Sequence, residues 1–88
     1  MEITFTRPAL RDLERIRAFI ARDDPGRAEV LADIRVAINR LAVYPAQGRP
    51  GNKAGTRELI VPHLPYKVPY RVRGENVLIL RVLHTRQQ

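Results

Sequence analysis

Hydrophobic and polar positions change their period several times along this chain, and each change predicts a new element. Ile3 and Phe5 alternate with polar neighbours, which is the period-two pattern of a short first strand. From residue 7 to residue 22, apolar residues recur at spacings of three and four, which predicts an amphipathic helix. Thr6 is placed to cap this helix, and Pro8 is tolerated in its first turn.

A second helix is predicted to follow directly. Asp24 is placed as its cap, with Pro25 at the first helical position, where the missing N–H costs nothing. One apolar face of this helix is marked by Leu31, Ile34, Ile38 and Leu41. The two helices meet across a tight turn and are expected to form an antiparallel hairpin. The glycine-rich stretch 47–55 then predicts a loop.

The rest of the chain predicts three strands, at 57–61, 66–73 and 77–83. In the middle strand, tyrosine and valine at even positions alternate with Lys67, Pro69, Arg71 and Arg73, so one face is apolar and the other is cationic. Pro69 has no N–H for the ladder, so a bulge or a locally broken pair is expected there.

Two connections fix the register of these strands. The proline-bracketed link 62–65 places Leu59 beside Val68 on the core face. After Arg73, a three-residue turn at 74–76 keeps charge out of the core, because it opposes Arg73 to Val77. That register predicts a core face with Leu78, Leu80 and Val82, and it places Arg71 and Arg81 together on the opposite face.

These elements predict an α+β fold with an N-terminal strand, an antiparallel helical hairpin and a three-stranded antiparallel meander. Both helices pack on one face of the sheet and leave a basic face open. A chain of 88 residues, 44% apolar and 28% charged, suits one ordered domain spanning 1–88. No apolar run has the length of a signal-peptide core or a membrane span, so we expect a cytoplasmic protein with no membrane association.

The net charge of +7 is concentrated in the second half of the chain. Residues 1–48 hold eight arginines and seven acidic residues, a balance of +1, whereas residues 49–88 hold eight cations and two glutamates, a balance of +6. Such polarisation indicates an acidic partner. The alternative is an arginine-rich surface that serves solubility only, and the ratio of fourteen arginines to two lysines is compatible with that.

Candidate chemistry lies on the cationic face. Guanidinium groups on a rigid sheet suit the recognition of phosphate or carboxylate groups. The candidate target-binding residues are Arg49, Lys53, Lys67, Arg71, Arg73 and Arg81. Glu58 is the only acid near this face and is expected to pair with Arg71. The alternative for Lys67 and Arg73 is a solvated strand face.

The two histidines differ as candidates for a catalytic role. His84 is able to act as a general acid or base if a phosphodiester binds beside Arg81, although alternation turns its side chain toward the helices, where a structural role is equally open. His63 lies in the proline-bracketed link and is expected to be exposed. No cysteine is present, and two dispersed histidines make no metal site, so we expect neither a metal nor a cofactor.

The chain resembles the ParE/RelE toxin superfamily over essentially its whole length. The motifs that carry this resemblance are Gly48-Arg49-Pro50, Gly55-Thr56-Arg57-Glu58-Leu59, Pro65-Tyr66-Lys67-Val68, Tyr70-Arg71-Val72 and Ile79-Leu80-Arg81-Val82-Leu83-His84. The resemblance implies the toxin of a type II toxin–antitoxin system. It also implies an acidic antitoxin whose C-terminal segment wraps this chain, and operator DNA binding only through the antitoxin complex.

The superfamily divides by mechanism. RelE-like members cleave mRNA in the ribosomal decoding site, and the resemblance places Arg71, Arg81 and His84 as catalytic residues if this chain is of that kind. The tyrosine that commonly follows is replaced by Thr85, and a lysine-rich cluster is missing. ParE-like members poison DNA gyrase and are not enzymes.

The long helical hairpin is more similar to ParE-like members, so we favour a gyrase poison, with the ribosome-dependent nuclease as the alternative. A third hypothesis is a harmless basic module that binds a partner and contributes to regulation.

Overall fold

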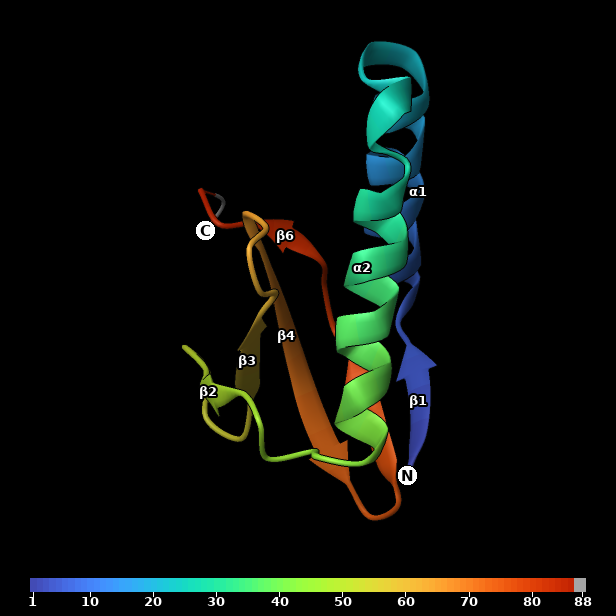
Figure 1. The fold of residues 1–88 in the computed structure, drawn as a ribbon. Coiled ribbons are helices and arrows are strands. Elements are labelled where there is room, and N and C mark those ends of the chain that lie inside the picture. The colour runs from blue at the N-terminus through green and yellow to red at the C-terminus, as the bar shows by residue number, and fades with distance from the viewer. Residues whose placement is uncertain (87–88) are drawn as a thin grey trace.

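Two helices lie side by side on one face of a mixed sheet in the computed structural model of this chain, which describes residues 1–86 (Figure 1). The α+β fold predicted from the sequence is confirmed. The helical elements are α1 (Arg7–Asp23), the 3₁₀ turn η1 (Pro25–Arg27), α2 (Glu29–Asn39) and the 3₁₀ turn η2 (Arg40–Ala42). The strands are β1 (Glu2–Phe5), β2 (Arg49–Pro50), β3 (Arg57–Ile60), β4 (Tyr66–Arg73), β5 (Asn76–Ile79) and β6 (Leu83–His84).

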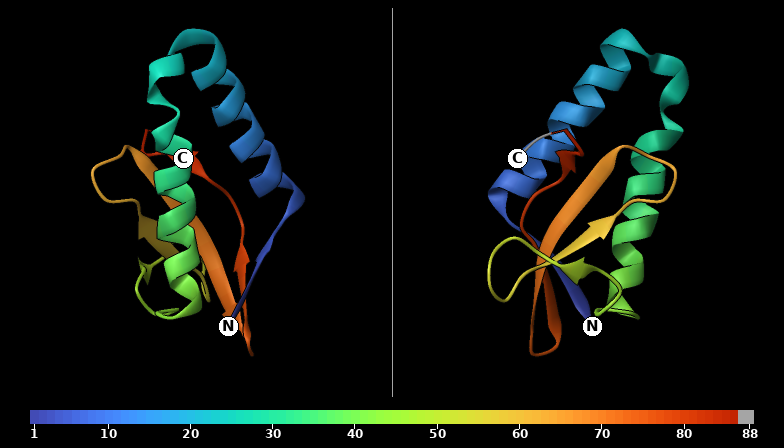
Figure 2. Two further views of the ribbon diagram at one scale, coloured as in Figure 1. Left: turned by 45° about the vertical axis from the view of Figure 1, so that its right-hand side comes forward. Right: turned by 90° about the vertical axis from the view of Figure 1, so that its left-hand side faces the viewer.

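The sheet has the order β1-β5-β4-β3-β2, and β6 pairs with β4 beyond the end of β5. The meander β3-β4-β5 is antiparallel, as predicted, whereas β1 runs parallel to β5. The helical hairpin covers one face, and the turn between the helices projects past the end of the sheet (Figure 2). The loop between β2 and β3 borders a cavity on the opposite face, together with Glu58, Lys67 and Pro69.

The first helix begins as its sequence predicts. The Thr6 hydroxyl accepts a hydrogen bond from the Ala9 N–H at 3.1 Å and so caps α1. The second helix begins later than predicted. The Asp24 N–H instead bonds to the Ile20 carbonyl and closes α1, the Asp24 side chain makes no cap bond, and Pro25 starts a 3₁₀ turn. The α-helical geometry of α2 is reached only at Glu29.

The core lies between the hairpin and the sheet. Ile34, Ile38 and Leu41 from the second helical segment are fully buried against the sheet. Tyr70 is fully buried as well, and its hydroxyl accepts a hydrogen bond from the Gly48 N–H at 2.8 Å and donates one to the Pro45 carbonyl at 2.7 Å. Gly48 has no room for a side chain, because a Cβ there would lie 2.7 Å from the Tyr70 hydroxyl. This contact fixes the start of the loop that leads to β2.

The register of β4 against β5 differs from the prediction. Arg73 pairs with Asn76 across a two-residue turn, in which Gly74 takes a positive φ of 55°, so the predicted three-residue turn is wrong. Val77 and Ile79 therefore face the core, and Leu78 and Leu80 lie on the opposite face and are half-buried. Glycine at the first turn position allows this tight turn without strain.

A bulge later restores Val82 to the core. Between the Tyr70–Ile79 and Lys67–Leu83 pairs, two residues of β4 face three residues of the returning chain, 80–82. This extra residue reverses the alternation of side chains. The break lies opposite Pro69, whose carbonyl accepts a hydrogen bond from the Leu80 N–H at 2.9 Å. The irregularity predicted at Pro69 is therefore confirmed.

The link between β3 and β4 follows the sequence prediction. Leu59 pairs with Val68, both side chains are buried, and the Val61 N–H donates to the Tyr66 carbonyl at 3.0 Å. The short strand β2 was not predicted, because two residues carry no periodic pattern.

Candidate functional site

The open face of the sheet carries a basic cavity beside the glycine-rich loop. Lys67 comes from β4, Lys53 from the loop, and Arg81 from the bulged segment between β5 and β6. The cavity has a volume of about 250 Å³ and is also lined by Glu58. Three cationic groups around one cavity suit an anionic ligand such as a phosphate group. Half of the predicted target-binding residues are thus brought together.

The other predicted cations lie outside this cavity. Arg49 in β2 faces Glu58 across the ladder, and its guanidinium Nη2 lies 2.9 Å from the Glu58 carboxylate. The predicted Glu58–Arg71 pair is therefore wrong, since Glu58 pairs with Arg49 instead. Arg71 donates from Nη1 to the Ala54 carbonyl at 3.3 Å and so holds the loop. Arg73 is exposed at the end of β4.

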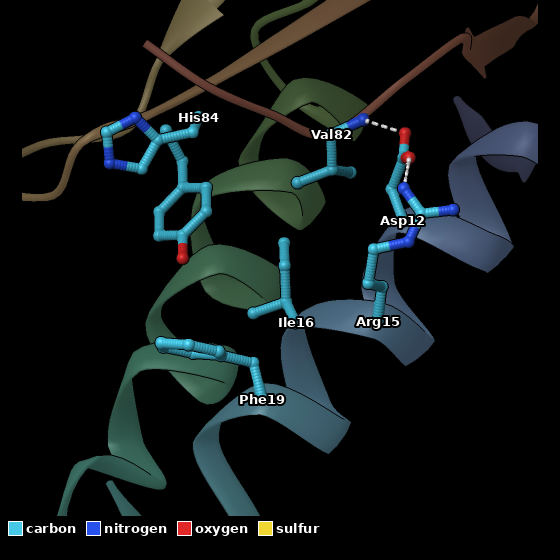
Figure 3. Close-up of a pocket in the computed structure, with 7 residues that line it drawn as sticks. Asp12, Arg15, Ile16, Phe19, Val82 and His84 are labelled. Atoms are coloured by element: carbon cyan, nitrogen blue, oxygen red, sulfur yellow. Dashed lines mark hydrogen bonds and ion pairs between the residues drawn. The ribbon is translucent and has the colours of Figure 1, made fainter. Parts of the chain in front are cut away.

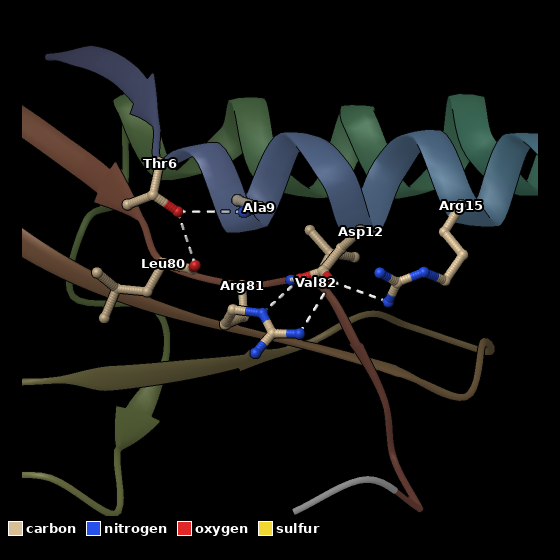
Figure 4. Close-up of polar contacts among 7 residues, drawn as sticks. All are labelled: Thr6, Ala9, Asp12, Arg15, Leu80, Arg81 and Val82. Atoms are coloured by element: carbon tan, nitrogen blue, oxygen red, sulfur yellow. Dashed lines mark hydrogen bonds and ion pairs between the residues drawn. The ribbon is translucent and has the colours of Figure 1, made fainter.

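Arg81 forms an ion pair with Asp12 of α1 (Figure 4). Its Nε donates to Asp12 Oδ2 at 2.7 Å and its Nη2 to Oδ1 at 3.0 Å, which is a bidentate pair. Asp12 Oδ2 also accepts the Val82 N–H at 2.9 Å. Six residues earlier, at the N-cap of α1, the Thr6 hydroxyl donates to the Leu80 carbonyl at 2.8 Å. The start of α1 therefore fixes the bulged segment at both of its ends.

Burial and charge act in opposite directions on Asp12. Its side chain is only 4% exposed, and burial alone raises the pKa of the carboxyl group. The hydrogen bonds from Arg81 and from the Val82 N–H outweigh burial, so the pKa of Asp12 is lowered from its ordinary value. The carboxylate is therefore ionised at neutral pH, and it compensates the charge of Arg81.

Arg71 and Arg81 do not form the pair that the sequence predicted. Arg81 does line the open-face cavity, and its side chain is 42% exposed, but two of its three guanidinium nitrogens bind Asp12. The guanidinium of Arg71 binds the loop. The physical reason is the bulge, because it breaks the side-chain alternation at residues 80–82, where Arg81 and the Val82 N–H meet Asp12 of α1.

A second cavity, about 280 Å³ in volume, lies between α1 and the last strand (Figure 3). We call it the α1 groove. Ile16, Phe19 and Val82 give it an apolar lining, and the polar residues that complete the lining are Asp12, Arg15, Tyr66 and His84. Phe19, which lines this groove, is 54% exposed and so is open to contact from solvent. The groove therefore suits an apolar side chain of a binding partner.

His84 lies in this groove, on the helix side of the sheet, as alternation predicted. Its ring makes an edge-to-face contact with Tyr66 at a centroid distance of 5.7 Å, and its Nδ1 accepts a hydrogen bond from the Arg86 N–H at 3.2 Å. His63 is exposed in the β3–β4 link, as predicted, with a positive φ of 65°. The structure thus separates His84 from the open face that carries Lys67.

Asp12 and Phe19 were not singled out from the sequence. Asp12 is an acid beside the apolar stripe of the helix, next to Leu13 and between Ala9 and Ile16, and that position is a signal for a buried, paired carboxylate. Phe19 lies off the stripe, which is a signal for an exposed apolar contact. Neither pattern predicts which residue or molecule makes the contact. For Asp12 the partner is Arg81, which lies 69 positions further along the chain.

Within residues 1–86, no three side chains of histidine, aspartate or glutamate gather as a group that could hold a metal ion. No helix in this part of the chain is long and apolar enough to cross a membrane.

The family model for the ParE toxin of the parDE type II toxin–antitoxin system matches residues 3–88. The chain therefore belongs to the ParE toxin family.

Relatives and a solved structure agree with this assignment. "Putative toxin Y4kP" of Sinorhizobium fredii is 48% identical over 87 residues, covering 98% of this chain and 90% of that protein. "Toxin RelE2" of Caulobacter vibrioides is 37% identical over 84 residues, covering 94% and 93%. The structure of the chromosomal ParDE system of P. aeruginosa is similar with a TM-score of 0.82 and 30% identity, covering 96% of this chain and 95% of that one. The chain is a toxin of a type II system, with an antitoxin as its partner.

Proposed function

We propose that this toxin is a ParE-like poison of DNA gyrase. The observation that carries the proposal is the dispersal of the residues that a nuclease would need. Arg81 is bound by Asp12, Arg71 by the loop carbonyl of Ala54, and His84 lies on the helix side of the sheet. A ribosome-dependent nuclease must stabilise a pentavalent phosphate and assist proton transfer at one place. A gyrase poison needs only a complementary protein surface.

The second candidate function is the RelE-like mRNA endonuclease. The cavity lined by Lys53, Lys67 and Arg81 favours it, because these cations suit the backbone of a nucleic acid. Glu58, the acid that lines this cavity, is paired with Arg49, and His84 is not among the lining residues. Phosphate binding without proton transfer supports docking on nucleic acid rather than cleavage.

The acidic antitoxin binds, in this proposal, along the α1 groove. An apolar side chain of its C-terminal segment fills the space beside Phe19 and Ile16, and its carboxylates meet Arg15, whose side chain is 72% exposed. Aromatic contacts in a desolvated groove supply affinity, and the cations of the toxin raise the association rate at low salt. Operator DNA is then bound through the toxin–antitoxin complex.

Expression of the chain without its antitoxin tests the proposed function. We expect growth arrest with a DNA-damage response, relieved by co-expression of the antitoxin. His84→Gln keeps the size and hydrogen bonding of the side chain but removes the titratable group, and it is expected to leave the arrest unchanged. General acid or base assistance contributes about 10²- to 10⁴-fold, so a nuclease would lose its effect in this variant.

Three outcomes would argue against the proposal. Translation arrest without a DNA-damage response would favour the ribosome as the target. Loss of arrest in a folded His84→Gln protein would favour the nuclease mechanism. Normal growth at full expression of the parent chain would favour the harmless regulatory module.

A further inference from the structure

The cations on the open face differ in how their charge is compensated. Lys53 and Lys67 line the basic cavity, and no ion pair within residues 1–86 engages either of them. Arg81 lines the same cavity but forms a bidentate ion pair with Asp12. The three cations are therefore not equivalent toward an anionic ligand.

We propose that Asp12 is a specificity-determining residue, which withholds Arg81 from phosphate ligands and leaves Lys53 and Lys67 as the phosphate-binding groups of the open face. Asp12 is 4% exposed, so solvent hardly competes for its oxygens. It takes the Nε and Nη2 donors of Arg81, one of the two guanidinium edges that can bind a phosphate group in a fork, and its negative charge compensates that of Arg81.

The backbone contact of Asp12 makes this arrangement hard to open. Its Oδ2 accepts the Val82 N–H as well as Arg81 Nε, so rotation of the carboxylate toward solvent would leave a buried N–H without a partner. The Thr6–Leu80 hydrogen bond holds the same segment from the other side. At the Nε–Nη2 edge of Arg81, a phosphate group therefore competes with a fixed acceptor. This inference concerns the open face alone and holds whichever target the toxin has.

Binding of a single-stranded oligothymidylate, followed by fluorescence anisotropy over a range of salt concentrations, tests the proposal. For single strands the logarithm of the affinity falls with the logarithm of salt concentration by about 0.7 per phosphate contact. Lys67→Gln is expected to reduce this slope by about 0.7 and to weaken binding severalfold at low salt. Arg81→Gln is expected to leave the slope unchanged. Equal losses in the two variants would overturn the proposal.

Asp12→Asn provides the converse test. Without the carboxylate, Arg81 becomes available, and we expect a slope steeper by about 0.7 and severalfold tighter binding. Glu14→Gln is the matched control, because it removes one negative charge from the same helix and releases Arg17, which is not part of the cavity. The gain of Asp12→Asn must exceed that of Glu14→Gln and must vanish in the double variant with Arg81→Gln. A gain equal to the control would contradict the proposal.

The unsubstituted chain gives a readout that does not depend on the folding of any variant. During titration with the oligothymidylate, the side-chain amine signals of Lys67 are expected to shift in the NMR spectrum, while the Nε–H signal of Arg81 stays in place. A shift of the Arg81 signal as large as that of Lys67 would show that phosphate displaces Asp12, and the proposal would fail.

Discussion

Asp12→Ala is expected to lower the free energy of unfolding by about 2–3 kcal/mol, because hydrogen bonds to a charged group contribute about 1.5–3 kcal/mol and a buried N–H is left without a partner. Arg81 is half-exposed and can turn to water, so the full penalty of a broken buried ion pair does not apply. The Val82 N–H is buried and cannot turn to water in the same way. For a chain of this size the melting temperature should fall by roughly 10–20 °C.

Thermal and urea unfolding followed by circular dichroism measure this loss. Glu14→Ala is the control, because it breaks an ion pair on the same helix, with Arg17, whose two side chains are both well exposed. Exposed pairs contribute little to stability, so the control should melt close to the parent. Equal melting temperatures for Asp12→Ala and the control would show that the Asp12 contacts do not hold the last strand.

The same contacts predict a dependence on pH. The folded-state pKa of Asp12 is lowered, with the bonds from Arg81 and Val82 outweighing burial. Its stabilisation is thus fully present above the unfolded pKa of about 3.9, and it is lost as the pH falls through the lower folded value. The difference in unfolding free energy between the parent and Asp12→Ala should shrink in that acidic range. A difference that is constant down to the lowest pH would contradict this assignment.

Phe19→Asp is expected to weaken antitoxin binding by about 30- to 100-fold or more, since truncation of a central aromatic anchor costs about 2 kcal/mol or more. The new carboxylate adds repulsion toward an acidic partner. The fold should be retained, because Phe19 is 54% exposed and lies outside the core. Calorimetric titration of the toxin with its cognate antitoxin measures the change.

Leu10→Asp is the matched control for this substitution. Leu10 is an apolar residue of the same helix with a similar exposure of 52%, and it does not line the α1 groove. We expect this variant to keep most of its affinity, apart from the general effect of one added negative charge. If Leu10→Asp weakened binding as much as Phe19→Asp, the antitoxin site would have to be placed elsewhere on α1.

The elements were predictable where local chemistry decides them. Thr6 caps α1 with its own hydroxyl, and the alternation in β4 follows directly from its burial against the helices. The register of β5 against β4 could not be predicted by assuming that core and surface side chains alternate without interruption. Gly74 permits the tighter turn, and the bulge at 80–82 then corrects the parity that this turn would disturb. The two-residue turn and the bulge together place apolar side chains in the core on both sides of the break. Either irregularity alone would place part of this segment on the wrong face.

The candidate site was predictable only in part for a related reason. The sequence identified the cations, and the structure brings Lys53, Lys67 and Arg81 to one cavity. It did not identify their partners, because the packing of α1 against the sheet brings Asp12 to Arg81, a contact between distant parts of the chain. Arg49 meets Glu58 through the short strand β2, which has no periodic signal.

The most direct test of the proposed function is the effect of the purified toxin on DNA gyrase. We predict that the toxin inhibits ATP-dependent supercoiling and causes cleaved DNA to accumulate, that the antitoxin prevents both effects, and that His84→Gln acts as the parent does. Gyrase that is unaffected at saturating toxin, together with codon-positioned cuts in mRNA that disappear with His84→Gln, would contradict the proposal and establish the nuclease in its place.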